Sequence, residues 1–112
     1  MTANMIVLDD GNFGSEVEKA EGLVVVDFWA PWCAPCRAVA PVMEALARDY
    51  EGRVRFAKLN VDEAPVTASS YGIQSIPTIA VFRDGVAVAG VAGAAPKAYL
   101  AEMIDKQLPQ AA

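Results

Sequence analysis

The 112-residue chain predicts a single α/β domain, residues 1–112, in which helices cover both faces of a five-stranded mixed β-sheet. Three observations support this prediction. Strand-like and helix-like stretches follow one another in the order β-α-β-α-β-α-β-β-α. The nearly unbroken apolar run Leu23–Trp29 is typical of a central strand that is covered on both faces. The last two strands flank Arg83-Asp84-Gly85, a short turn that indicates an antiparallel hairpin.

The predicted strands cover residues 5–8, 23–29, 53–61, 79–82 and 86–91. A short first helix should follow Asn12, which can cap it, and end at Gly22. The second helix is predicted over residues 33–50, where apolar residues recur every three or four positions. Pro41 lies inside it and should bend its axis. A third helix should end near Tyr71-Gly72, and a fourth should run over residues 96–108.

Composition excludes several functions. The chain has 9 Lys and Arg against 14 Asp and Glu, and its net charge of -5 disfavours a nucleic-acid partner. No apolar stretch reaches the roughly 20 residues that a membrane helix needs, and no signal-peptide pattern is seen, so a monomeric cytoplasmic protein without a membrane partner is expected. Because histidine is absent, Cys-His and Ser-His-Asp catalysis are excluded.

Both cysteines of the chain lie in the stretch Trp32-Cys33-Ala34-Pro35-Cys36. Residues three apart on a helix lie about 5–6 Å from each other on one face, which a disulfide can bridge. A helix that begins near Cys33 would favour a thiolate there, while Cys36 would lie one turn deeper. The spacing therefore predicts that Cys33 attacks a substrate disulfide and that Cys36 resolves the mixed disulfide.

Three other interpretations of this cysteine pair are a zinc half-site, a static disulfide and two buried thiols. Zinc needs about four protein ligands, and a chain with two cysteines and no histidine does not supply them alone, so no metal is expected. A static disulfide that closes so short a loop would constrain the unfolded chain little. Redox chemistry is therefore the favoured interpretation.

Several spaced motifs resemble the thioredoxin family. They are residues 26–37, Pro41, Lys58-Leu59-Asn60-Val61-Asp62, Tyr71-Gly72-Ile73, Ile76-Pro77-Thr78 and Gly93. The resemblance covers about residues 5–108 and implies the thioredoxin fold, a five-stranded mixed sheet flanked by four α-helices. It also implies a protein-disulfide reductase that needs no bound cofactor and is re-reduced by thioredoxin reductase with NADPH. One residue departs from the family's usual motif, because Ala34 stands where glycine is common.

The resemblance also implies roles for individual residues. Asp27 would accept the proton of Cys36, with Lys58 as its partner, and burial in an apolar strand by itself predicts a raised pKa for Asp27. A purely structural ion pair is the alternative. A cis bond would precede Pro77 beside the cysteines, and Ile76 would pair with substrate backbone; a simple strand-entry proline is the alternative.

An apolar platform for substrates is expected around Cys33. Its predicted members are Trp32, Ala34, Pro35, Ile76, Pro77 and Gly93, with Ala92 and Ala94 as either contacts or ordinary loop residues. The acidic side chains of Glu16, Glu18, Glu44 and Glu51 are expected to be solvated surface. Two rival functions stay open: a disulfide oxidase or isomerase, which differs in redox potential and compartment, and a binding scaffold whose redox chemistry is incidental.

Overall fold

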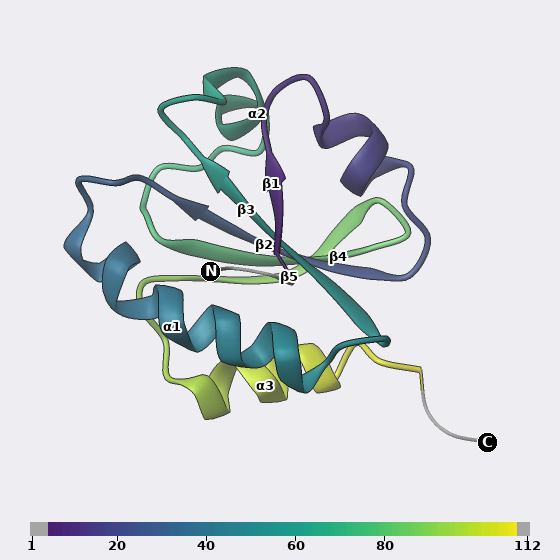
Figure 1. Ribbon diagram of the computed structural model, residues 1–112. Coiled ribbons are helices and arrows are strands. Elements are labelled where there is room, and N and C mark those ends of the chain that lie inside the picture. The colour runs from purple at the N-terminus through teal and green to yellow at the C-terminus, as the bar shows by residue number, and fades with distance from the viewer. Residues whose placement is uncertain (1–4, 110–112) are drawn as a thin grey trace.

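The computed structural model describes residues 5–109 and contains one five-stranded sheet in the order β1-β3-β2-β4-β5. The strands are β1 (Met5–Leu8), β2 (Leu23–Trp29), β3 (Val54–Asn60), β4 (Thr78–Arg83) and β5 (Val86–Ala92). The α-helices are α1 (Ala34–Asp49), α2 (Pro65–Ser70) and α3 (Lys97–Asp105). Figure 1 shows α1 and α3 on one face of the sheet and α2 on the other. The predicted mixed sheet with helices on both faces is confirmed.

The central strand β2 places alternate side chains in two separate cores. It runs parallel to β3 and antiparallel to β4, so it is hydrogen-bonded on both sides. Leu23 and Val25 pack with α1 and α3, whereas Val24, Val26 and Phe28 pack on the opposite face. Because side chains alternate along a strand, Asp27 lies on the same face as Val25 and points toward α1.

Helix α1 begins where the cysteine spacing predicts. Cys33 is its N-cap residue, with an extended backbone, and Pro35 lies in the first turn, where a missing N–H costs nothing. The buried face of α1 consists of Cys36, Val39, Met43, Leu46 and Ala47. Pro41 lies within α1, as expected, and its side chain is exposed.

The first helix differs from the prediction. It is a five-residue π-helix, η1 (Gly14–Glu18), so the structure has three α-helices and a π-helix between residues 5 and 109 rather than four α-helices. The prediction that Asn12 caps it is wrong. The Asn12 side chain instead closes the turn after β1, because its Oδ1 accepts from the Asp9 N–H at 2.8 Å and its Nδ2 donates to the Val7 carbonyl at 3.0 Å.

The C-terminal half follows the predicted order with one shorter element. The turn between β4 and β5 has positive φ angles at Asp84 and Gly85, as a tight hairpin requires. Helix α3 ends at Asp105 rather than near residue 108, because the N–H groups of Gln107 and Leu108 bond only three residues back and form a turn. None of the helices described between residues 5 and 109 has the length and apolar character needed to cross a membrane.

Candidate active site

The two cysteines form a disulfide at the N-terminus of α1. Their Cα atoms are 5.2 Å apart, and the side chains are 5% (Cys33) and 2% (Cys36) exposed. The backbone N–H of Cys36 donates to Cys33 Sγ at 3.2 Å. When the bond is reduced, this N–H and the helix dipole would stabilise a negative charge on Cys33. The geometry therefore favours Cys33 as the reactive thiolate.

An exposed rim surrounds this disulfide. Trp32 is 67% exposed, and its Nε1–H donates to Asp62 Oδ2 at 2.9 Å, which fixes the indole beside the cysteines. Ala34 and Pro35 are exposed on the first turn of α1. Asp62 belongs to one of the motifs noted in the sequence, yet its spacing there gave no hint of a contact with Trp32.

A second segment closes the rim from the sheet side. The Ile76-Pro77 peptide bond is cis, as the resemblance implies, and the Ile76 carbonyl oxygen lies 3.6 Å from Cys33 Sγ. The Gly93 N–H donates to the Pro77 carbonyl at 2.8 Å, so these two loops lie side by side. Ile76 thus lies next to the disulfide, and Gly93 is bonded to the neighbouring Pro77. Ala92 pairs with Thr78 in the sheet, and Ala94 is exposed in the loop that follows β5.

Ala34 is the first residue of α1, and its methyl group is exposed. Its backbone φ is not positive, so this position does not require glycine. We expect Ala34→Gly to lower the free energy of unfolding of the oxidised protein by about 0.5–1 kcal/mol, because glycine loses more backbone entropy in a helix. Urea denaturation measures this, with Ala38→Gly on an exposed turn of the same helix as the matched control. Unchanged or increased stability of Ala34→Gly would contradict the expectation.

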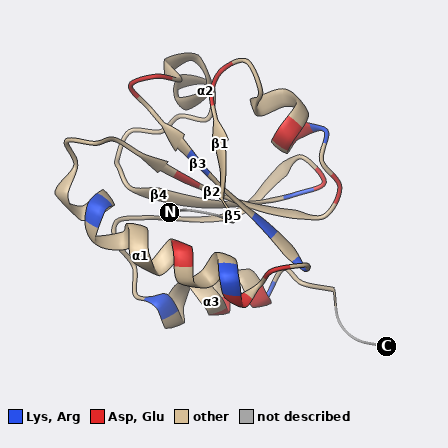
Figure 2. Ribbon diagram, in the orientation of Figure 1, with Lys and Arg blue, Asp and Glu red and all other residues tan. Residues whose placement is uncertain are grey.

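Asp27 is a buried carboxyl beneath the disulfide. It is 5% exposed, and its Oδ1 has no hydrogen-bond partner among residues 5–109. Burial raises the pKa of Asp27 to about 7, and the positive charge of Lys58 opposes that rise. Asp27 is the acidic residue of β2, and Figure 2 shows a red, acidic stretch within this strand.

Lys58 is the neighbour of Asp27 in the parallel register of β2 and β3. Its Nζ lies 5.4 Å from the centroid of the Trp29 ring, and in the described part of the chain it makes no ion pair within 4.0 Å. Lys58 therefore acts on Asp27 through its electric field. The alternative of a closed structural ion pair between these two residues is not what the structure contains.

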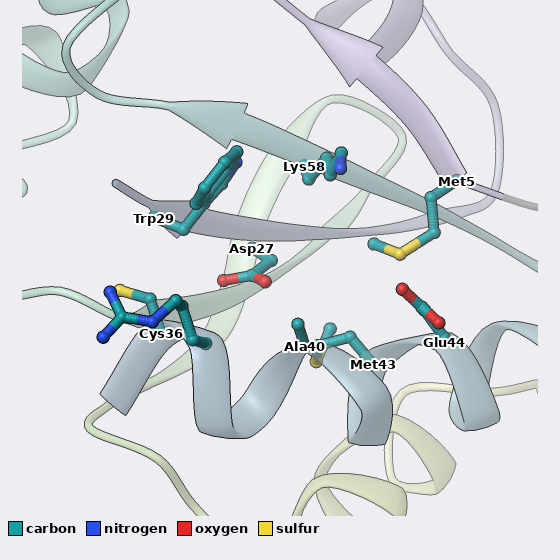
Figure 3. A pocket seen from close by; sticks show the side chains of 9 residues that line it. Met5, Asp27, Trp29, Cys36, Ala40, Met43, Glu44 and Lys58 are labelled. Carbon is teal, nitrogen blue, oxygen red and sulfur yellow. The ribbon is translucent and has the colours of Figure 1, made fainter. Parts of the chain in front are cut away.

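A cavity of about 80 Å³ connects these groups (Figure 3). It is lined by Met5, Asp27, Trp29, Cys36, Arg37, Ala40, Met43, Glu44 and Lys58. The volume has room for several water molecules. Water would also satisfy two buried polar atoms that lack partners in the described chain, Asp27 Oδ1 and Trp29 Nε1. Cys36 and the Asp27 carboxyl thus lie on one cavity that water can fill.

Glu44 is less exposed than the sequence led us to expect. Its side chain is half-buried and lines the cavity. The helical spacing contained the signal, because residues 36, 40, 43 and 44 recur at the intervals of one helix face. Between residues 5 and 109, no group of three or more Cys, Asp or Glu side chains is arranged to hold a metal ion.

The α/β sheet and the disulfide at a helix N-terminus define a dithiol–disulfide oxidoreductase. The sequence profile of the thioredoxin family matches residues 4–106. The chain is 52% identical over 101 residues to the thioredoxin of Synechocystis sp., covering 90% of this chain and 94% of that protein. It is 51% identical over 104 residues to the thioredoxin of Staphylococcus aureus, covering 93% and 98%.

A third relative is the chloroplastic M-type thioredoxin of Triticum aestivum, 48% identical over 104 residues. The match covers 93% of this chain, which spans 59% of the length of that wheat protein. The chain belongs to the thioredoxin family and has the thioredoxin fold. Its activity is the reduction of protein disulfides by dithiol–disulfide exchange.

Proposed function

We propose that this chain carries two electrons at a time from an NADPH-dependent thioredoxin reductase to disulfides in protein substrates. The observation that carries this proposal is the Cys33-Cys36 disulfide, placed at a helix N-terminus beside an exposed rim. The electrons reside in the cysteine pair, so the chain itself needs no bound cofactor. NADPH would act through the reductase, because the chain has no glycine-rich dinucleotide fingerprint.

In the proposed reaction the Cys33 thiolate attacks one sulfur of the substrate disulfide. A bond forms between Cys33 and that sulfur, and the other substrate sulfur leaves as a thiolate. Cys36 then loses its proton and attacks Cys33 Sγ, which closes the Cys33-Cys36 disulfide and releases the second substrate sulfur. The N–H of Cys36, 3.2 Å from Cys33 Sγ, supports the choice of Cys33 as the attacking residue.

Asp27 is the proposed acceptor of the Cys36 proton. The carboxyl and Cys36 line the same cavity, so the transfer can pass through water. A pKa near 7 lets Asp27 accept and release a proton near neutral pH, and Lys58 contributes by keeping that pKa from rising further. Lys58 is thus a positioning charge in this proposal.

Replacing Asp27 with Asn should slow the reduction of a protein disulfide. A wild-type rate that depends on ionised Asp27 should rise with pH through about 7, since the carboxyl must lose its proton before it can act as a base. The variant should lack this rise in rate and, above pH 7, should be slower than wild type by about 100-fold or more. The measurement is the single-turnover rate between pH 5.5 and 9, and an unchanged pH profile in the variant would reject the proton-transfer role.

The substrate would dock on the exposed rim around Cys33. The proposed contacts are Trp32, Ala34, Pro35, Ile76, Pro77 and Gly93, with the Ile76 backbone pairing with the substrate chain. Support comes from the exposure of Trp32 and from the position of the Ile76 carbonyl beside Cys33 Sγ. A reducing compartment such as the cytoplasm fits a protein that works as a dithiol, and the chain is proposed to act there as a monomer.

The test uses NADPH and thioredoxin reductase as the sole electron source and insulin as the disulfide substrate. Sustained NADPH oxidation that requires this chain is expected, and its absence would overturn the proposal. Equilibration with glutathione distinguishes the rival oxidase or isomerase, which would have a higher reduction potential. A Cys33→Ser/Cys36→Ser double variant that keeps the biological effect would instead point to a binding scaffold.

A further inference from the structure

The cavity beside Asp27 has two ends. Cys36 and Trp29 lie at the end nearest the disulfide, and Glu44 and Met5 lie at the other, with the Asp27 carboxyl between them (Figure 3). Met5 comes from the edge strand β1, and Glu44 comes from the third turn of α1. The cavity therefore runs along the side of α1 from Cys36, the resolving cysteine, to the edge strand β1.

Four charged side chains face this cavity, and they come from three of the elements around it. Asp27 comes from β2, Lys58 from β3, and Arg37 and Glu44 from α1; β1 contributes the apolar Met5, and β4 places the apolar Ile79 opposite Asp27. Arg37 is engaged, because its Nη1 donates to the Pro31 carbonyl at 2.9 Å. Lys58 lies over the Trp29 ring.

Glu44 is the second carboxyl on the cavity, and its surroundings leave it available. Its side chain is half-buried, and within residues 5–109 it makes neither an ion pair nor a hydrogen bond. Figure 3 shows its carboxyl group extending from α1 toward Met5, at the end of the cavity away from Cys36. A carboxyl that is partly exposed and partly inside can exchange protons on both sides.

Resting on the proposed role of Asp27, we propose that Glu44 passes protons between Asp27 and bulk solvent. Asp27 is 5% exposed, so a proton that it takes from Cys36 has to leave through the cavity. Glu44 acts through Asp27 and never touches the sulfur atoms, which makes it a positioning residue for proton exchange. Nothing in the cysteine motif itself indicates this role.

Each proton in the proposed relay has a donor and an acceptor. Water in the cavity moves the proton of Cys36 to Asp27, and the resulting thiolate attacks the mixed disulfide and releases the substrate sulfur. Protonated Asp27 then passes its proton through water to the Glu44 carboxylate, and Glu44 releases it to solvent or buffer. The departing substrate thiolate takes one proton from solvent, so two electrons leave the cysteine pair and no other oxidant or reductant is needed.

The experiment measures single-turnover reduction of insulin by the reduced protein, using rapid quenching with an alkylating reagent. Wild type, Asp27→Asn, Glu44→Gln, Glu44→Asp and Glu51→Gln are compared in dilute buffer and again with added imidazole. Glu51→Gln removes the same charge from an exposed carboxyl beyond the far end of α1, so it is the matched control. Urea denaturation confirms that each variant is folded.

We expect Glu44→Gln to be about three- to tenfold slower in dilute buffer, less than the effect of losing a general base. Added imidazole should restore the rate of Glu44→Gln, because a small buffer can carry the proton in its place. Glu44→Asp and Glu51→Gln should match wild type in both buffers.

Each other outcome is decisive. If Asp27→Asn is slow while Glu44→Gln matches wild type in dilute buffer, the Glu44 proposal fails and the role of Asp27 stands. If Glu44→Gln is slow and imidazole does not restore it, the substitution has altered the shape of the cavity and the relay is rejected. If Asp27→Asn reacts at the wild-type rate, the proposed roles of Asp27 and of Glu44 are both rejected.

Discussion

Replacing Cys33 with serine should abolish disulfide reduction, whereas replacing Cys36 with serine is expected to trap substrates in mixed disulfides on Cys33. The reason is the asymmetry of the pair. Cys33 lies at the N-cap of α1 and receives the Cys36 N–H at 3.2 Å, so its thiolate is the stabilised one. Without the Cys36 sulfur, the first attack still occurs, but no thiol is in place to resolve its product.

Mass spectrometry of the reaction with a protein disulfide measures both variants. Cys33→Ser should show no covalent adduct and lose at least about 1,000-fold in rate, as expected when the nucleophile of a covalent mechanism is removed. Cys36→Ser should accumulate one substrate per chain, and a reducing agent should release it. Because each variant keeps one cysteine, each is the control for the other. An adduct on Cys36 in the Cys33→Ser protein would reverse the assigned roles.

The fold was predictable wherever the apolar pattern was long. Leu23–Trp29 is apolar on both faces because both faces are covered, and the sheet order places it in the centre. The helix over residues 33–50 was predictable from its three- and four-residue spacing, and its start from Pro35. In a long segment many residues indicate the same secondary structure, so a single polar exception such as Asp27 does not obscure the apolar pattern.

Short segments were harder to predict from the sequence. A π-helix at Gly14–Glu18 has too few residues for its period to show, and Asn12 has several backbone groups within reach. Which one it bonds depends on the path of the chain after β1.

Within the site, the closeness of the two cysteines was predictable because their spacing along one helix sets the distance between them. The contact of Trp32 with Asp62 and the position of Glu44 on the cavity join segments far apart in sequence. Only the packed structure brings those residues together.

Replacing Asp27 with Asn should also stabilise the oxidised protein above neutral pH. Burial raises the pKa of Asp27 from 3.8 to about 7. Between these two values the unfolded chain has lost the proton while the folded chain keeps it, so the free energy of unfolding of the wild type falls as pH rises from about 4 to 7. Above pH 7 the folded protein holds a buried charge that asparagine would not carry.

At 1.36 kcal/mol for each pKa unit, the rise to about 7 corresponds to about 4 kcal/mol, which is the upper limit of the gain. We expect Asp27→Asn to be about 2–4 kcal/mol more stable than wild type at pH 8, because the buried amide costs part of that sum. Near pH 4 the two proteins should differ little, since wild-type Asp27 is then neutral in the folded state.

Urea denaturation at pH 4, 6 and 8 measures this difference, with Glu51→Gln as an exposed-carboxyl control whose stability should follow wild type. A difference that is the same at all three pH values would show that packing, and not the buried charge, separates the two proteins. Stability and turnover should therefore move in opposite directions in Asp27→Asn. Such an opposition is expected when a fold keeps a costly buried group for its chemistry, whereas a residue kept for structure would lose stability when replaced.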